Sequence, residues 1–318
     1  MTTALPLFSI VVPVYQNRDN LDSTAAQLLA LGAELPGYEL ELVFVEDGST
    51  DGSREKLAEL AARHPRQIRV VMLTRNYGQN AAIQAGLRYA QGAVVGVISC
   101  DLQEPHRKFI EMLALWTAGH KFVIGERTER SEGWWHRQVS SIYWRLLRRY
   151  AFRNYPPMGY DFCVLDRQVV EAVNQINEKN SAIFVLIFWL GYTPARVPIA
   201  REVRQSGRSQ WGLWRKIHFT LDTLIGFTHT PARLITVMGL SVAGLSLLYL
   251  IFVLYRWATT STAPLGWITV VGLVTLLGSL NLFAIGILSE YLLRILDETR
   301  KRPAYVVDTV LGQAGPPH

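Results

Sequence analysis

The chain begins with an alternation of two kinds of segment that continues to about residue 126. Short apolar runs predict strands at residues 7–15, 38–49, 68–74, 93–99 and 121–126. The segments between them have apolar residues at helical spacing, which predicts helices at residues 20–35, 53–64, 80–92 and 106–119. Strands and helices that alternate in this way favour an α/β fold, in which helices cover both faces of a mostly parallel sheet.

Beyond residue 126 this alternation stops. The run 132–151 combines Trp and Tyr with Arg, which predicts a basic amphipathic helix suited to a membrane interface. Further helices are predicted up to about residue 177 and at 181–190, and a last strand at 195–204. A second amphipathic interface helix is predicted at 210–232.

Two long stretches, 234–255 and 257–289, contain no charged residue. Each is at least as long as the roughly 20 residues that a helix needs to cross the hydrocarbon core of a bilayer. The sequence therefore predicts two transmembrane helices. The alternative is a hydrophobic helical hairpin that is buried in an oligomer.

Basic residues flank these stretches, and the chain as a whole has a net charge of +6. The positive-inside rule then predicts a multi-pass protein of the cytoplasmic membrane with both termini in the cytosol, resting on an anionic membrane face. The apolar N-terminal run has no basic residues before it, so we interpret it as a strand and expect no signal peptide. Nucleic-acid binding is the competing interpretation of a basic chain, but apart from the basic amphipathic helix assigned to the membrane interface no basic helix or aromatic platform supports it.

These features divide the chain into four predicted parts. They are a cytosolic catalytic domain at 1–209, the amphipathic juxtamembrane helix at 210–232, two transmembrane helices with a short external loop at 233–289, and a cytosolic tail at 290–318. The two cysteines, Cys100 and Cys163, fit neither a metal-site spacing nor a disulfide framework, which favours a reducing compartment.

Polar clusters follow the first four predicted strands, and in a parallel sheet all of them would lie on one rim, where such folds bind ligands. Asp101 and Gln103 lie two residues apart after the fourth of these strands. Their oxygens suit Mg²⁺ or Mn²⁺, which bind a few protein ligands together with phosphate oxygens. The alternative is that Asp101, four residues before Pro105, begins the next helix as its N-cap.

Asp47 follows the second predicted strand, directly before Gly48. A carboxylate at this position can accept hydrogen bonds from the N–H edge of a nucleobase. The alternative is turn chemistry, because Asp-Gly-Ser is a common turn sequence. For Asp51 we expect a helix cap and no ligand contact.

Arginines suited to phosphate binding come later in the chain, because a guanidinium group can donate two parallel hydrogen bonds. Arg127 and Arg130 follow a predicted strand, Arg137 and Ser141 share one face of an amphipathic helix, and Arg204 ends the last predicted strand. The alternative is a solvated or headgroup-facing surface, which we prefer for Arg145, Arg148 and Arg149.

The order of several short motifs, together with the two long apolar stretches, matches a known family pattern. The motifs are "VVPVYQN", "FVEDGSTDGS", "RNYGQNAAIQAGL", "CDLQEP", "GERTER", "YDFCVLDR" and "RQSGRSQW". The chain resembles the polyprenyl-phosphate glycosyltransferases, a membrane-bound branch of the family-2 glycosyltransferases. This branch includes dolichyl-phosphate mannose synthases and bacterial undecaprenyl-phosphate sugar transferases with two transmembrane helices. The resemblance implies a Rossmann-like, nucleotide-sugar-binding sheet of the glycosyltransferase A type.

The resemblance also implies roles for individual residues. The nucleotide-sugar donor would contact Pro13, Tyr15, Asn17, Val45, Asp47, Ser99, Cys100 and Asp101. Phosphates of the donor and of the lipid acceptor would contact Arg127, Arg130, Arg137, Ser141, Arg204 and Gln210. The metal, Mg²⁺ or Mn²⁺, would bind Asp101 and Gln103, and the catalytic residues would be Asp101, Asp161 and Arg127.

Three positions depart from the family pattern. Asn17 replaces a usual Glu, Ser99 replaces a usual Asp, and Gln210 replaces a usual Lys. The change at Ser99 removes one negative charge from the expected metal site, and the change at Gln210 removes one phosphate contact.

The expected function is inverting transfer of one sugar from a UDP- or GDP-sugar to a polyprenyl phosphate at the cytosolic face of the bilayer. The acceptor phosphate is already an anion, so we expect no strong general base. Homo-oligomerisation, as a tetramer, is expected by resemblance, and nucleic acid is not an expected partner. One alternative is a catalytically silent membrane scaffold of a glycan-assembly complex, and another is a processive polysaccharide synthase.

Overall fold

A computed structural model describes residues 5–127, 155–156, 159–176, 182–200, 266–300 and 302–312, and scattered residues between 237 and 259. The chain divides into two compact units. One contains Met1–Lys216 together with Pro303–His318, and the other contains Ile217–Arg302. The second unit is therefore an insertion in the sequence of the first, and each is described by itself.

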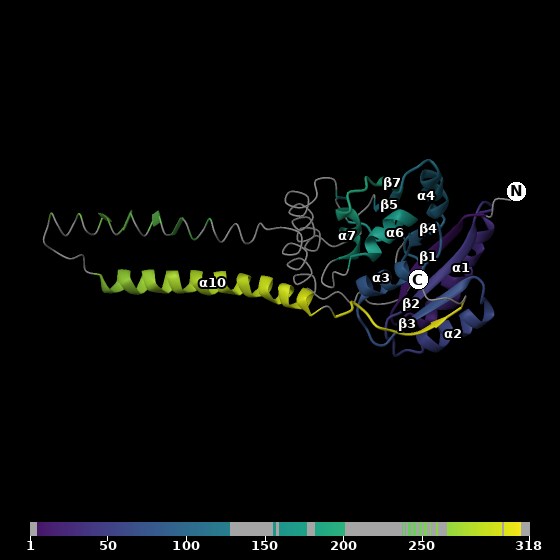
Figure 1. Cartoon of the computed structure of the whole chain (residues 1–318), viewed down its shortest axis with the longest axis horizontal. Coiled ribbons are helices and arrows are strands. Elements are labelled where there is room, and N and C mark those ends of the chain that lie inside the picture. Colours follow the sequence, from purple (N-terminus) through teal and green to yellow (C-terminus); the bar gives the residue numbers. More distant parts are fainter. Residues whose placement is uncertain are drawn as a thin grey trace. The chain divides into compact units, whose positions relative to one another are not determined.

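The first unit contains an eight-stranded sheet in the order β7-β5-β6-β4-β1-β2-β3-β8 (Figure 1). The strands are β1 (Leu7–Val14), β2 (Glu39–Glu46), β3 (Ile68–Leu73), β4 (Val94–Val97), β5 (Phe122–Arg127), β6 (Cys163–Asp166), β7 (Ala195–Ile199) and β8 (Val307–Leu311). The central strands β4, β1, β2 and β3 are parallel, whereas β6 and β8 run antiparallel to their neighbours. The predicted mostly parallel α/β sheet is confirmed.

Helices cover both faces of this sheet (Figure 1). They are α1 (Leu21–Ala33), α2 (Ser53–Arg63), α3 (Gln79–Tyr89), α4 (Lys108–Thr117), α6 (Arg167–Asn174) and α7 (Ile183–Trp189), with a short 3₁₀ turn η1 (Arg18–Asn20) before α1. Helices α1 and α2 contact each other, and α3, α6 and α7 form a second group. Each helix in these groups was predicted from its apolar spacing.

Side chains of β1 alternate between the two layers, as the period of a strand requires. Phe8, Ile10 and Val12 are fully buried in the core that includes residues of α1 and α4. Val11 points to the other face, where a Cβ on Gly86 of α3 would lie only 2.2 Å from its Cγ1 atom. The glycine lets α3 approach the sheet closely and fixes its position behind the strand ends.

Two strands were not predicted. β6 has only four residues, and it lies in a segment that the sequence pattern left without an assigned element. β8 belongs to 290–318, which the sequence pattern separated from the catalytic domain as a tail. Its side chains are half-buried or exposed, so it lacks the apolar alternation by which a half-buried strand is predicted. The compact unit that contains the sheet thus includes Pro303–His318.

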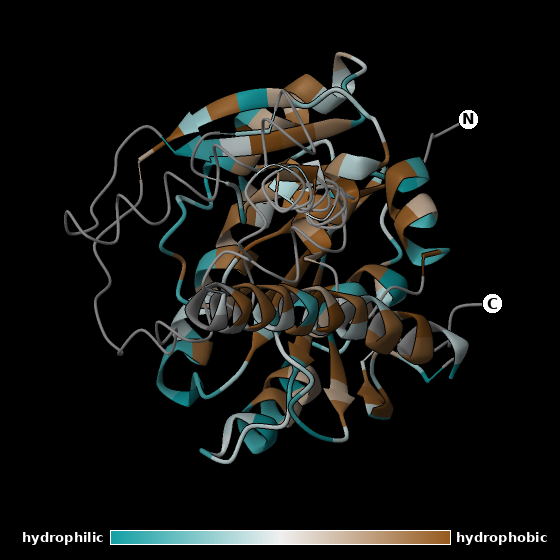
Figure 2. Ribbon diagram, turned by 90° about the vertical axis from the view of Figure 1, so that its left-hand side faces the viewer, coloured by the Kyte–Doolittle hydropathy of each residue, from teal (hydrophilic) through white to brown (hydrophobic). Residues whose placement is uncertain are grey.

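The second unit contains α10 (Trp267–Thr299), a helix of 33 residues. At 1.5 Å per residue it is about 50 Å long, more than a bilayer core requires. Within it Leu276–Leu293 is long and apolar enough to cross a membrane, by length and composition, and hydrophobic residues dominate the helix in Figure 2. The other predicted span, 234–255, and the juxtamembrane helix 210–232 lie largely or wholly outside the described residues.

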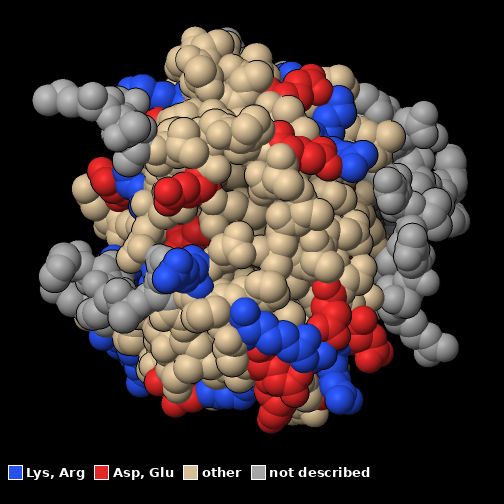
Figure 3. Space-filling model, turned by 90° about the vertical axis from the view of Figure 1, so that its right-hand side faces the viewer, with Lys and Arg blue, Asp and Glu red and all other residues tan. Residues whose placement is uncertain are grey.

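The end of the sheet unit seen in Figure 3 has basic and acidic side chains next to each other. Ion pairs between basic and acidic side chains also connect helices of the first unit. Lys56 of α2 pairs with Asp22 of α1 at 2.7 Å, and Arg107 pairs with Glu34 at 2.8 Å. Exposed pairs of this kind contribute about 0–1 kcal/mol each, so we treat them as ordinary surface.

Candidate active site

The four polar clusters lie at the carboxyl ends of adjacent strands, β4, β1, β2 and β3, as predicted. We call this edge of the sheet the rim. Two residues on it, Gln16 after β1 and Leu102 after β4, have left-handed backbones with φ of 52° and 46°. In the described part of the chain they are the only residues other than glycine with positive φ. Such conformations cost about 1 kcal/mol or more and cluster at functional sites.

Leu102 separates the two predicted metal ligands. Its N–H donates to the Ser99 carbonyl at 3.2 Å, which closes a turn directly after β4. The competing interpretation of Asp101 as a helix N-cap is wrong, because α4 begins at Lys108 and its N-cap is Arg107. Asp101 therefore lies in a strained turn at the rim and caps no helix.

Gln103 is nearly buried, with 7% of the residue exposed. A nearly buried amide needs polar partners, and at the mouth of a sheet a ligand can supply them. The described residues contain no group of three or more His, Cys, Asp or Glu that could hold a metal. The Asp101 carboxylate and the Gln103 amide are oxygen donors of the kind that Mg²⁺ and Mn²⁺ combine with water and phosphate, and the metal site at these two residues stays a prediction.

Asp47 lies two strands away from Asp101, across β1. It is 2% exposed, and its Oδ1 and Oδ2 atoms accept hydrogen bonds from the backbone N–H groups of Tyr77 at 2.7 Å and Gly78 at 2.8 Å. Burial raises the pKa of this carboxyl group, and the two backbone hydrogen bonds oppose the rise. Asp47 thus holds the loop between β3 and α3, and a nucleobase would have to share its remaining lone pairs. Its contact with a nucleotide stays a prediction.

The loops after β2 and β3 also touch through their backbones. Gly48 has φ of +69°, and a Cβ at this position would lie 2.4 Å from the backbone nitrogen of Asn76. Only glycine fits this combination of a left-handed backbone and a close approach. The "EDGSTD" and "TRNYGQN" clusters are therefore one packed structure.

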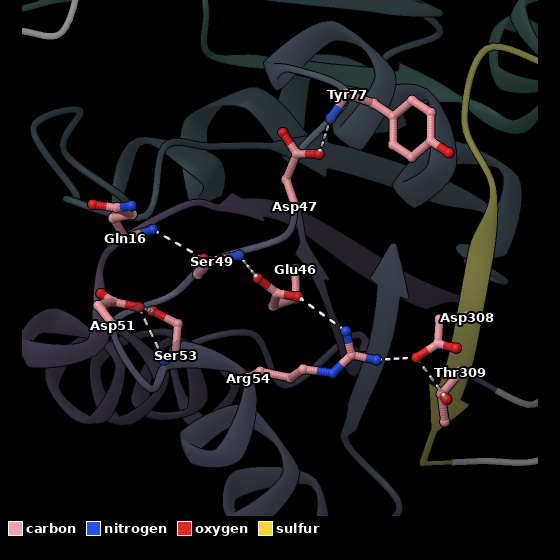
Figure 4. A network of polar contacts seen from close by, with 10 residues as sticks. All are labelled: Gln16, Glu46, Asp47, Ser49, Asp51, Ser53, Arg54, Tyr77, Asp308 and Thr309. Atoms are coloured by element: carbon pink, nitrogen blue, oxygen red, sulfur yellow. Dashed lines mark hydrogen bonds and ion pairs between the residues drawn. The ribbon is translucent and has the colours of Figure 1, made fainter. Parts of the chain in front are cut away.

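A second set of contacts joins the ends of β1 and β2 (Figure 4). The Gln16 N–H donates to the hydroxyl of Ser49 at 3.0 Å, and the Ser49 N–H donates to fully buried Glu46 at 2.5 Å. Asp51 accepts from the N–H and the hydroxyl of Ser53, the first residue of α2, although the N-cap position itself is Gly52. Burial acts against ionisation of Asp51, but these bonds and one from the Arg18 N–H lower its pKa overall.

Arg127, Asp161 and Glu104 form a charged cluster beside the rim. The guanidinium group of Arg127 pairs directly with Asp161 and lies 3.8 Å from the carboxylate of Glu104, which is fully buried. Two further buried atoms, Nε of Arg127 and Oδ1 of Asp161, have no hydrogen-bond partner among the described residues. The cluster joins the "GERTER", "YDF" and "CDLQEP" strings in space.

Sequence reasoning missed Glu104. Its position directly after Gln103 in "CDLQEP" was the available signal, but only Asp101 and Gln103 of that segment were assigned, as metal ligands. The ion pair with Arg127 connects Glu104 to the end of a different strand, which no local pattern predicts.

The other predicted donor residues lie around the same strand ends. Pro13 of β1 faces Val45 of β2 in register, and Val45 is fully buried. Asn17 donates a side-chain hydrogen bond to the carbonyl of Tyr15, at the start of η1. The carbonyl of Cys100 accepts from the hydroxyl of Thr24 in α1 at 2.7 Å. Ser99 closes the Leu102 turn, as described above.

The Cys100 side chain itself packs in the core beneath the rim, and burial raises its pKa to about 12. Any contact of Cys100 with a donor would therefore involve its backbone. Five predicted residues, Arg130, Arg137, Ser141, Arg204 and Gln210, lie outside the described residues.

Comparisons with known proteins identify the family to which this chain belongs. Residues 9–173 match glycosyl transferase family 2. The glycosyltransferase YkcC of Bacillus subtilis is 32% identical over 306 residues, covering 96% of this chain and 94% of that protein. The bactoprenol glucosyl transferase of Shigella phage SfV is 30% identical over 300 residues, covering 94% and 97%.

Among solved structures, glucosyl-3-phosphoglycerate synthase from Mycobacterium tuberculosis, in complex with Mn²⁺ and UDP-glucose, matches 68% of this chain and 76% of its own. Its TM-score is 0.48 and its sequence identity is 16%. The family match and the full-length identity carry the assignment: the chain is a glycosyltransferase that belongs to glycosyl transferase family 2.

Proposed function

We propose that this protein transfers one sugar from a UDP- or GDP-sugar to a polyprenyl phosphate at the cytosolic membrane face, with inversion and with a divalent cation. One observation carries the proposal. The similarity to a bactoprenol glucosyl transferase covers 94% of this chain and 97% of that protein, so it is not limited to the family-2 region at residues 9–173. A relative that shared only the donor-binding sheet would not support a lipid acceptor.

The acceptor chemistry explains which residues the site does not need. A lipid monophosphate is an anion at neutral pH, so its oxygen can attack the sugar without a strong general base. Burial raises the pKa of both cysteine thiols, Cys100 and Cys163, which leaves neither as a thiolate nucleophile. The main requirements are a stabilised leaving group and a nucleophile held in line.

Asp101 and Gln103 are the residues that would hold the divalent cation. When bound, the cation would offset the charge on the nucleotide diphosphate as the sugar bond breaks. The turn at Leu102 fixes the backbone between the two ligands, so their spacing does not depend on a flexible loop. The replacement of a usual Asp by Ser99 leaves this site with a single carboxylate.

Arg127 would bind a phosphate group while Asp161 and Glu104 hold its orientation. A guanidinium group has five N–H donors, and the Nε–H of Arg127 has no partner among the described residues. Asp161 pairs with the same guanidinium group, so Asp161 acts through Arg127 unless its second oxygen contacts the sugar. With both carboxylates ionised the three side chains have a formal net charge of −1, so the cluster would hold a phosphate weakly, which favours release of the product.

We also propose that two transmembrane helices, one of them within α10, and the amphipathic segments 132–151 and 210–232 keep this site at the bilayer surface. A homotetramer is part of the same proposal. The lipid phosphate would then reach the site from the interface, and the donor would reach it from the cytosol.

The test is a transfer assay with purified full-length protein, undecaprenyl phosphate, Mg²⁺ or Mn²⁺, and a panel of radiolabelled UDP- and GDP-sugars. We expect one donor to give a lipid carrying a single sugar, whose anomeric configuration is opposite to that of the donor. No lipid-linked product with any donor would contradict the proposal and favour a membrane scaffold. A polymeric product would favour a processive synthase.

A further inference from the structure

Strand β8 closes the sheet although little apolar burial explains its position. It pairs antiparallel with β3, and Val310 within it and Val306 just before it are 37% and 42% exposed. The fit at its end is tight. Gly312 has φ of +88°, and a Cβ there would lie 2.1 Å from the carbonyl oxygen of Ile68. The strand is thus fitted closely to β3 without contributing much to the core.

The strand reaches the loops of the rim in two ways. The carbonyl of Val306 accepts a hydrogen bond from the N–H of Thr74 at 3.0 Å, at the start of the loop between β3 and α3. The hydroxyl of Thr74 lies 3.0 Å from that of Tyr77, and the Tyr77 N–H is held by Asp47. One side of this loop is therefore fixed by Asp47 and the other side by the segment before β8.

The second connection is a chain of polar contacts, visible in Figure 4. Asp308 of β8 pairs with Arg54 of α2, and Arg54 lies 3.9 Å from the buried carboxylate of Glu46. Glu46 accepts the N–H of Ser49, whose hydroxyl accepts the N–H of left-handed Gln16. The chain of contacts thus joins the C-terminal strand to the strained turn after β1.

The exposure of these groups indicates what the contacts do. The side chains of Arg54 and Asp308 are 34% and 48% exposed, and a pair so accessible to water adds little to folding stability. Glu46 has no exposed surface, so its orientation depends on the groups that face it. The pair is better suited to positioning Glu46 and the loop that Glu46 holds than to stabilising the fold.

We infer that β8, through Asp308 and Arg54, positions the donor-binding loops at the ends of β1, β2 and β3. Asp308 and Arg54 are positioning residues in this inference, because they act through Glu46. The inference rests on the proposed function in one respect, namely that these loops bind the nucleotide of the donor. It assigns a role in donor binding to the segment after α10, which the sequence pattern separated from the catalytic domain.

Two variants of the full-length protein test the inference, one at the ion pair and one at the end of β8. Asp308→Asn removes the charge that faces Arg54, and Gly312→Ala pushes the end of β8 away from Ile68. Glu59→Gln is the matched control, because it breaks an ion pair with Arg63 on the same helix α2. The measurements are the dissociation constants of UDP and GDP by calorimetry, steady-state kinetics with the active donor, and the unfolding temperature.

We expect Asp308→Asn and Gly312→Ala to raise the dissociation constant of the nucleotide and the KM for the donor by about three- to tenfold. The KM for the lipid acceptor and kcat should stay within about twofold of wild type, because the loops that move are those of the donor. Amide hydrogen exchange should become faster at residues 74–78. Glu59→Gln should change none of these values.

The results separate the possible outcomes. Unchanged nucleotide binding in a folded Asp308→Asn variant would overturn the inference. If binding, kcat and the unfolding temperature all fell together, β8 would be purely structural, which would also overturn it. If Gly312→Ala fails to fold, Asp308→Asn alone decides. A wild-type protein that binds neither UDP nor GDP would remove the proposed function, and the inference with it.

Discussion

Buried polar networks lie at both ends of the central strands, and they differ in the hydrogen bonding of their carboxylates and in the strain of their backbone. At the base, Glu41 uses both oxygens within the protein. Oε1 accepts from Arg69 at 3.0 Å, and Oε2 accepts from the Ser9 hydroxyl and from the Gln91 N–H. The Ser9 hydroxyl in turn accepts the N–H of Gly92. The carboxylate is fully used by its neighbours, so this network is suited to a structural role.

The rim also contains buried basic and acidic side chains, but some of their donors and acceptors have no hydrogen-bond partner in the described part of the chain. Nε of Arg127 and Oδ1 of Asp161 are buried and have no hydrogen-bond partner among the described residues. The backbone is strained at Gln16 and Leu102, whereas no residue of the base network has positive φ. Within the described residues the base also leaves two buried donors open, Nη1 and Nη2 of Arg69, so the difference lies in its fully bonded carboxylate and its unstrained backbone. The rim combines an open carboxylate oxygen with a strained backbone, which suits a ligand.

The largest expected effect is on catalysis at the rim. Asp101→Asn should lower the rate of sugar transfer by about a thousandfold, because it removes the only carboxylate of the proposed cation site. The unfolding temperature should stay close to that of wild type. The control is Asp22→Asn, which removes an exposed carboxylate from α1 and should leave transfer unchanged. Equal rates for wild type and Asp101→Asn would show that the catalytic centre lies elsewhere.

The base network should respond in the opposite way. Glu41→Gln leaves Arg69, which is 1% exposed, without the carboxylate that it pairs with. Breaking a buried pair from one side typically costs about 3–5 kcal/mol of folding stability, and we expect a loss near the lower end. Chemical denaturation measures it, with exposed Glu39→Gln on the same strand as the control. The comparison fails if Glu41→Gln lowers kcat without destabilising the protein.

A third substitution tests the packing of the rim loops. Gly48→Ala should destabilise the protein by about 2 kcal/mol, because its Cβ would collide with Asn76 and its backbone is left-handed. Gly37→Ala is the matched control, because a Cβ there meets no atom within 4 Å. Donor binding should weaken only in Gly48→Ala. Similar stabilities for the two variants would mean that the rim loops are not rigidly packed.

The smallest expected effect concerns the cysteines, which we expect to stay unreactive in the native protein. Cys100 lies under the rim and is 3% exposed, and burial raises its pKa to about 12. Its thiol should therefore remain protonated at pH 8.5, where an ordinary cysteine is partly a reactive thiolate. Iodoacetamide should add no mass to the native protein at that pH and should label Cys100 after unfolding. Rapid labelling of the native protein would show that the rim opens into the core.

Much of the fold could be predicted because its strands and helices have regular apolar spacing. The rim could be predicted as well, because parallel strands bring successive loop clusters to one edge. The strand β8 could not be predicted, since it is held by backbone pairing and by an ion pair between residues 254 positions apart. Local patterns contain no signal for such a contact.

The candidate site was predicted in part. The position of Asp101 at the rim followed from a carboxylate placed directly after a predicted strand. The left-handed backbone of Leu102 did not, because leucine rarely adopts this conformation. Glu104 was missed, since its contact with Arg127 depends on the arrangement of two separate strands.

The central claim is that a divalent cation at Asp101 and Gln103 binds the donor diphosphate. Calorimetric titration of UDP and GDP into wild type and Asp101→Asn, each with and without Mn²⁺, tests it most directly. We predict that one nucleotide binds wild type tightly only with Mn²⁺, and that Asp101→Asn loses this dependence. Equal affinity with and without Mn²⁺, or an unchanged response in the variant, would contradict the claim.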